Sequence, residues 1–162
     1  MSATPRVCAR VTLSPQEIDR WPDTPVARAL ATLWPRSRTA TFSLPAMDRA
    51  VPICRSLTRS WLAQQRFTDE DICDTVLLIS TELATNAIVH TGSAVITMSL
   101  RRNKDHLRIQ VRDQGTQSAG KHWHNTSGFG RGLEIIASYA GVLGTRRGAD
   151  GTRTMWATVN LA

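Results

Sequence analysis

Residues 69–91, DEDICDTVLLISTELATNAIVHT, give the strongest helix signal in the chain. Apolar residues recur in this stretch at helical spacing, namely Ile72, Val76, Ile79, Leu83 and Ala87. Thr68 begins an N-cap that is followed by three acidic residues, which complement the helix dipole, and Gly92 stops the helix. The stretch therefore predicts a long amphipathic helix that continues to about His90 and buries one face.

The segments on either side of this helix predict a sheet and two more helices. Residues 96–101 and 107–112 alternate apolar and polar side chains around a short polar turn, as expected of an antiparallel hairpin with one buried face. The other expected elements are a strand at 39–44, helices at 46–65 and from Gly130, and strands near 141–147 and 152–160. This order predicts an α/β protein, specifically a two-layer α/β sandwich with a mixed sheet and helices on one face.

Length and composition indicate a single globular domain. The chain has 162 residues, of which 41% are hydrophobic and 20% are charged. We interpret residues 1–39, which contain several prolines and one capped helix signal from Ser14 to Glu17, as a variable N-terminal extension, and residues 40–162 as the domain. The longest aliphatic run is far below a membrane span, so we expect a soluble cytoplasmic protein without a membrane partner.

The cysteines and the net charge limit the possible partners. The three cysteines are odd in number and form no CxxC pair, so we expect free thiols, not a disulfide framework or a zinc site. The formal net charge of +7 favours anionic partners. The basic residues are scattered along the sequence and aromatic residues are sparse, so the sequence predicts no direct nucleic-acid surface.

Three polar residues repeat along the long helix. Glu82, Asn86 and His90 recur every four residues, so they line one face beside the apolar stripe and can point into a shared cleft. The alternative is that they form the hydrated edge of an ordinary amphipathic helix.

A carboxylate is expected at the end of the second hairpin strand. Asp113 has the same parity as Leu107, Ile109 and Val111 and should face inward, where a carboxylate needs hydrogen-bond donors. A ligand amine would serve, and Gly115 would let a ring approach the backbone closely. Alternatively, Asp113 caps a turn and accepts hydrogen bonds from local backbone amides.

Glycines gather in two further segments. Gly128, Gly130 and Gly132 precede or open a helix, where free amides and the helix dipole favour phosphate, although such glycines also occur as plain loop residues. Residues 114–129, which lead into it, have no periodicity and predict a loop that could act as a lid. The glycine turn at Gly151 leads into the closing strand. This strand could contribute to a binding site, or it could be an ordinary core strand.

In this order and spacing, the segments resemble the GHKL (Bergerat-fold) ATPases and kinases, specifically the stand-alone anti-sigma factor serine/threonine kinase branch. Residues 82–91 (ELATNAIVHT) are similar to that family's N box, residues 113–115 (DQG) to its G1 box and residues 130–133 (GRGL) to its G2 box. Thr154 and Trp156 lie where the closing strand motif is expected. The resemblance covers roughly residues 40 to 160.

The resemblance implies a role for each matching residue in binding ATP and magnesium. Asn86 would ligate Mg²⁺, and Glu82 would act as the catalytic residue that orients or deprotonates the attacking hydroxyl. Asp113, Gly115 and Thr154 would bind adenine. The residues expected around the triphosphate are Gly130, Arg131, Gly132, Leu133 and, near the helix end, His90. The proline that often follows the G1 box is absent here.

Two functions follow from this resemblance. The first is an enzyme that transfers the ATP γ-phosphate to a serine or threonine of an anti-sigma factor antagonist and also sequesters a sigma factor, with a homodimer implied by resemblance only. The second is a non-catalytic regulator that uses ATP to set its shape for a protein partner. A DNA-binding protein would need a recognition helix and a basic stripe, and the sequence predicts neither.

Overall fold

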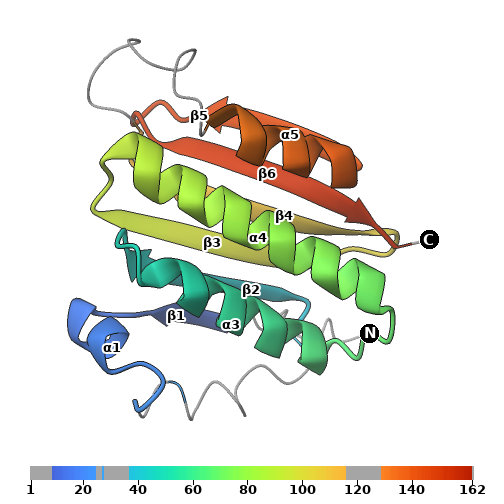
Figure 1. Cartoon of the computed structure of the whole chain (residues 1–162), viewed down its shortest axis with the longest axis horizontal. Coiled ribbons are helices and arrows are strands. Elements are labelled where there is room, and N and C mark those ends of the chain that lie inside the picture. The colour runs from blue at the N-terminus through green and yellow to red at the C-terminus, as the bar shows by residue number, and fades with distance from the viewer. Residues whose placement is uncertain (1–8, 25–26, 28–36, 116–128, 162) are drawn as a thin grey trace, which may run out of the picture.

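The computed structural model describes residues 9–24, 27, 37–115 and 129–161. Its helices α3, α4 and α5 lie side by side across one face of a single sheet, as Figure 1 shows. The predicted two-layer α/β sandwich with helices on one face is therefore confirmed. The expected lid, residues 114–129, lies mostly outside the described residues.

Six strands form the sheet in the order β1-β2-β3-β4-β6-β5. Only β1 and β2 pair in parallel, and the other pairs are antiparallel, so the sheet is mixed as expected. The strands are β1 (Ala9–Thr12), β2 (Thr39–Pro45), β3 (Val95–Arg102), β4 (His106–Asp113), β5 (Val142–Arg147) and β6 (Arg153–Asn160).

The helices are α1 (Pro15–Arg20), α3 (Ala50–Gln64), α4 (Glu70–Thr91) and α5 (Phe129–Tyr139). The central helix α4 begins one residue later than expected, because the side chain of Asp69, not that of Thr68, accepts a hydrogen bond from the Ile72 amide. It ends at Gly92, which has the left-handed φ of 61° that favours glycine at this position. Pro52 lies in the first turn of α3, where proline is tolerated.

The core lies between the sheet and the helices. Alternate residues of β2, β3, β4 and β6 are buried on the helix side, and the residues between them face the other side of the sheet. Trp61 of α3 and Ile79 and Leu83 of α4 are among the largest fully buried side chains. Burial raises the pKa of the Cys54 thiol to about 12, so this cysteine stays protonated in the core.

The segment before residue 39 contributes to the same sheet and core. The short strand β1 was not expected from the sequence, and it pairs in parallel with β2 at one edge. Leu13 and Ile18 are buried in the main core, and Ser14 and Glu17 form the capping box that the sequence predicted.

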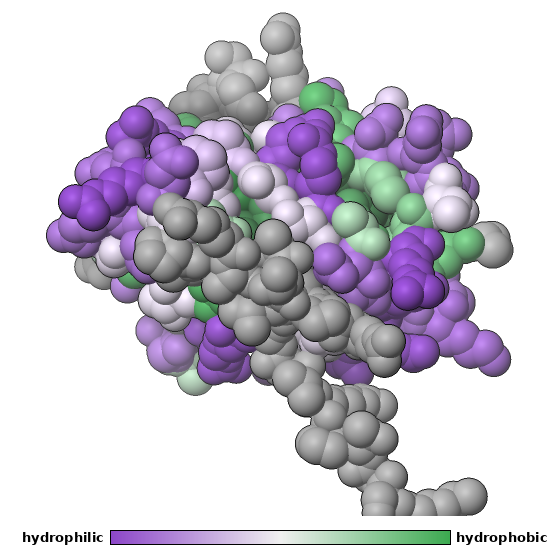
Figure 2. Space-filling model, turned by 90° about the horizontal axis from the view of Figure 1, so that it is seen from below, coloured by the Kyte–Doolittle hydropathy of each residue, from purple (hydrophilic) through white to green (hydrophobic). Residues whose placement is uncertain are grey.

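Helix α4 is long and apolar enough, by length and composition alone, to cross a membrane. In the fold it is the central core helix, and its apolar residues pack on the sheet and on α3. Seen from below, the part of the surface that is not grey is mainly hydrophilic, with only small hydrophobic areas (Figure 2). Packing inside an α/β domain therefore accounts for the apolar character of α4, and the cytoplasmic location stays a prediction.

Candidate functional site

Helix α4 carries two of the predicted site residues toward the end of the sheet where β4 stops. Glu82 and Asn86 lie one turn apart, and Asn86 is only 7% exposed, while Glu82 is partly buried. A buried amide needs hydrogen-bond partners. Asn86 has such a partner: its side-chain oxygen accepts a hydrogen bond from Arg153 Nη2 at 2.9 Å.

Asp113 ends β4 and faces the helix side of the sheet, as its strand parity predicts, with an exposed fraction of 2%. Its Oδ1 atom accepts a hydrogen bond from the Gly115 amide at 2.8 Å. This is the local turn-capping bond that the alternative interpretation predicted. The two readings of Asp113 are therefore compatible, because the carboxylate faces inward and also caps the turn after β4.

Arg153 joins Asp113 and Asn86. Its Nε and Nη2 atoms donate hydrogen bonds to Asp113 Oδ2 at 2.9 and 2.7 Å, and Nη2 also donates to Asn86. The strand register brings this about, because Arg153 is the direct partner of Asp113 across β4 and β6. Arg153 is 2% exposed. A guanidinium paired with a carboxylate in this way is a buried ion pair, which is costly to break on one side only.

The structure does not bring Thr154 to this site. Neighbouring residues of a strand face opposite sides of the sheet. Because Arg153 faces the helices, Thr154 faces away from them and lines a groove with Arg112 and Arg146. The expectation that the Thr154 hydroxyl supports the same ring as Asp113 is therefore wrong, and the residue of β6 that meets Asp113 is Arg153.

The first turn of α5 lies against Glu82. A Cβ atom added to Gly132 would lie 2.8 Å from Glu82 Oε2, so this glycine leaves room for the carboxylate. Gly130, Arg131 and Leu133 belong to the same turn, but the side chains of Arg131 and Leu133 lie outside the described part of the structure. The same holds for the side chain of His90, which belongs to the last turn of α4. The structure thus gathers Glu82, Asn86, Asp113 and Gly132, while their chemical roles stay predictions.

Gly115 allows two backbone segments to meet beside Asp113. Its φ of +72° is in the left-handed region, and a Cβ atom there would collide with the carbonyl oxygen of Gly151. The loop after β4 therefore packs directly on the turn before β6. In the described structure, Gly115 makes room for Gly151, and its expected contact with a bound ring stays a prediction.

We expect Gly115→Ala to lower the free energy of unfolding by at least about 3 kcal/mol, because left-handed strain and steric overlap add. Gly92→Ala is the matched control: its φ is +61°, but a Cβ atom there meets nothing within 4 Å. The control should lose only about 1–2 kcal/mol. Urea unfolding of both variants measures the difference, and equal losses would contradict the close approach.

Arg153 occupies donor and acceptor positions that both magnesium and adenine would need. The Asn86 side-chain oxygen is of the kind that magnesium accepts, but it already accepts a hydrogen bond from Arg153. Both oxygens of Asp113 are likewise engaged, one by Gly115 and one by Arg153. An adenine amine can reach Asp113 Oδ2 only if Arg153 leaves it.

The sequence contained a signal for Arg153 that the interpretation of the closing strand missed. Met155, Ala157 and Val159 alternate along β6 and are buried, so residue 153 shares their parity and also faces inward. An arginine at an inward position requires a buried acceptor. Asp113, predicted to be inward on the neighbouring strand, is that acceptor.

Comparison with known proteins bears on what such a site binds. A family model described as a histidine kinase-like ATPase domain matches residues 44–157, which is most of the chain. The matched region contains Glu82, Asn86, Asp113, Gly132 and Arg153. No curated protein sequence gives a significant match.

Proposed function

The chain belongs to the histidine kinase-like ATPase family, and on this basis we propose that it binds ATP with magnesium and phosphorylates a protein. The proposed reaction transfers the γ-phosphate of ATP to a serine or threonine of an anti-sigma factor antagonist. The proposed regulatory role is to hold a sigma factor inactive. The subtype, the serine or threonine specificity and both partners come from the resemblance of the sequence motifs.

One observation carries the proposal. The family's acid and amide on α4, the inward aspartate of β4 and the first turn of α5 lie around one point in the fold. Arg153 contacts both Asn86 and Asp113 within 2.9 Å, so the three side chains form one connected, buried cluster. Glu82 lies one helical turn before Asn86 on α4, and its carboxylate lies against Gly132 of α5.

Each residue has a task that its chemistry allows. Asn86 offers a side-chain oxygen of the kind that magnesium accepts as a ligand, and magnesium, when bound, neutralises phosphate charge. Glu82 can orient the hydroxyl of the protein substrate and take its proton. Asp113 can accept a hydrogen bond from the adenine amine and thereby select adenine, while amides at Gly130 and Gly132 can bind phosphate oxygens.

A second function is favoured by the ion pair itself. An adenine amine that bonds to Asp113 Oδ2 would displace Arg153, so the free and ATP-bound forms would differ at this site. A protein that only binds ATP would then change shape without transferring phosphate. We therefore keep a non-catalytic, ATP-dependent regulator as the second candidate.

Magnesium-dependent ATP binding tests the shared part of both candidates. We expect Asn86→Ala to weaken it about ten- to hundredfold, because the variant loses the oxygen proposed to bind magnesium. Asp113→Asn should weaken ATP binding too, and circular dichroism must show that this variant folds. Thr85→Ala is the control from the same helix, because its hydroxyl already donates to the Thr81 carbonyl. Calorimetric titration with and without magnesium gives the affinities, and unchanged binding by Asn86→Ala would refute the assigned site.

Transfer of labelled γ-phosphate separates the two candidates. The protein is incubated with labelled ATP and candidate antagonist proteins, and the products are analysed for phosphoserine and phosphothreonine. Labelled serine or threonine supports the kinase. ATP binding without transfer to any candidate supports the regulator.

A further inference from the structure

Five arginines from four strands share the face of the sheet opposite the helices. Strand parity and register place them there. The two strand neighbours of each arginine either face the core themselves or pair with residues that face the core, so the arginine between them points away from the helices. They are Arg10 on β1, Arg101 on β3, Arg108 and Arg112 on β4, and Arg146 on β5. Because the basic residues looked scattered along the sequence, their concentration on one face is a product of the fold.

No outward position of the six strands, within their described bounds, holds an aspartate or a glutamate. Threonine and serine fill many of the remaining positions, and some of these hydroxyls pair with each other, as Thr41 does with Ser99. Arg101 lies directly opposite Arg108 across β3 and β4. Like charges in that position destabilise a sheet, so the arrangement costs stability unless an anionic partner compensates it.

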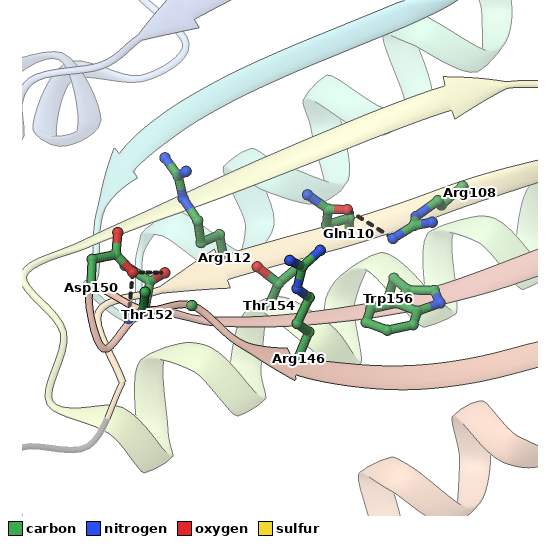
Figure 3. A pocket seen from close by; sticks show the side chains of 10 residues that line it. Arg108, Gln110, Arg112, Arg146, Asp150, Thr152, Thr154 and Trp156 are labelled. Atoms are coloured by element: carbon green, nitrogen blue, oxygen red, sulfur yellow. Dashed lines mark hydrogen bonds between the residues drawn. The ribbon is translucent and has the colours of Figure 1, made fainter.

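A groove of about 740 Å³ runs over this face between β4, β6 and the turn before β6. Figure 3 shows the side chains of Arg108, Arg112 and Arg146 on the side of the sheet away from the helices, around Thr154 and Trp156. Arg112 and Arg146 both oppose Thr154, one on each neighbouring strand, and both are exposed. The groove therefore presents guanidinium groups from two strands to one bound segment.

The floor of the groove is fixed in place. The guanidinium of Arg108 lies 4.8 Å from the centre of the Trp156 ring and donates a hydrogen bond to Gln110 at 3.2 Å. Trp156 also lies across Gly144, where a Cβ atom would collide with the indole. The carboxylate on the rim, Asp150, accepts hydrogen bonds from Thr152, which together with the charge of Arg112 lower its pKa. Asp150 is thus engaged at the turn.

Two other occupants fit this face poorly. A second copy of the chain, placed symmetrically, would bring arginines against arginines. A single nucleic-acid strand needs free aromatic surfaces on which bases stack. The outward strand positions offer one large aromatic ring, Trp156, and Arg108 and Gly144 flank it.

We propose that the arginine face, defined by Arg10, Arg101, Arg108, Arg112 and Arg146, is a docking surface for an acidic segment of a protein partner. Carboxylates pair with guanidinium groups through two parallel hydrogen bonds, and the surrounding hydroxyls can donate further ones. This surface lies on the other side of the sheet from the proposed ATP site, so a partner can bind here while the site stays accessible. Docking of an acidic segment agrees with the proposed function, because that function requires a protein partner. Binding of the segment does not depend on ATP binding.

The test measures binding of fluorescent poly-L-glutamate to the full chain without ATP. The double variant Arg112→Gln/Arg146→Gln removes two exposed charges from the groove, and we expect its affinity to fall about tenfold at low salt. The control Arg20→Gln/Arg59→Gln removes two exposed charges from α1 and α3 and should bind almost like the wild type. This control separates the face from the general attraction of a chain with a net charge of +7.

Three results would overturn the proposal. The first is that the wild type does not bind poly-L-glutamate at low salt. The second is that both double variants lose affinity equally, which would mean that only net charge matters. The third is that single-stranded DNA binds more tightly than poly-L-glutamate and is weakened selectively by the groove variant, because the face would then be a nucleic-acid surface. If the separate titration shows no ATP binding, the proposed function fails, but the test of the arginine face is unaffected.

Discussion

Replacing Arg153 with methionine is expected to destabilise the protein and, at the same time, to tighten magnesium-ATP binding. Methionine keeps much of the aliphatic volume but removes the guanidinium that donates to Asp113 at 2.7 and 2.9 Å. A buried carboxylate left without its partner costs about 3–5 kcal/mol of folding stability. Guanidinium-denaturation curves in the absence of nucleotide measure this loss.

The same change should favour ATP, because the adenine amine no longer has to displace Arg153 from Asp113. We expect the affinity for magnesium-ATP to rise about tenfold or more, which corresponds to roughly 1.4 kcal/mol per factor of ten. Saturating ATP should then restore part of the lost stability, since a ligand that binds only the folded state stabilises it. The opposite signs of the two effects distinguish this role of Arg153 from a purely structural one.

Two further variants serve as controls. Arg153→Lys keeps the charge but loses the pair of donors that Nε and Nη2 provide. Its stability and its affinity for magnesium-ATP should therefore lie between those of the wild type and of Arg153→Met. The double variant Asp113→Asn/Arg153→Met should regain part of the stability, because no buried charge remains unpaired. If Arg153→Met lowers both stability and ATP affinity, Arg153 supports nucleotide binding and does not compete with it.

Replacing Glu82 with alanine is expected to reduce phosphate transfer by about 10² to 10⁴ while ATP still binds. A hydroxyl is a weak nucleophile at neutral pH, and a positioned base contributes typically a factor of this size. Glu82 forms no ion pair with any residue that the structure describes, and its carboxylate faces Gly132 at the start of α5. Transfer of labelled phosphate and calorimetric ATP binding, measured on the same preparations, give the two quantities.

Glu82→Gln is the shape-preserving variant, and it should also lose transfer because an amide is no base. Glu134→Ala is the matched control, since Glu134 is an exposed acid on α5 and should leave transfer unchanged. A Glu82→Ala protein that phosphorylates its substrate normally would show that the role assigned to Glu82 is wrong. Loss of both binding and transfer would assign Glu82 to ATP binding.

Local patterns in the sequence were sufficient for most elements of the fold. The apolar period, the acidic first turn and Gly92 predicted α4 almost to the residue, because helix spacing and caps depend on near neighbours. The hairpin of β3 and β4 followed from strict alternation. The strand β1 was missed, because four residues carry little periodicity and its pairing with β2 depends on a segment about thirty residues away.

Part of the candidate site could also be predicted from the sequence. Glu82 and Asn86 share a helix face by spacing alone, and the parity of β4 turned Asp113 inward. Thr154 was misplaced by one position, because the motif was matched without applying the same parity rule to β6. A shift of one residue in a strand exchanges the two faces of the sheet.

The sequence by itself determined the main helices, most of the strands and the inward direction of residues such as Asp113, because these depend on spacing within a few residues. Only the tertiary structure decided that Arg153 meets Asp113 and Asn86, and that five separated arginines form one surface. Both results come from the order and register of strands. These arise from pairing between distant segments, which no local pattern in the chain records.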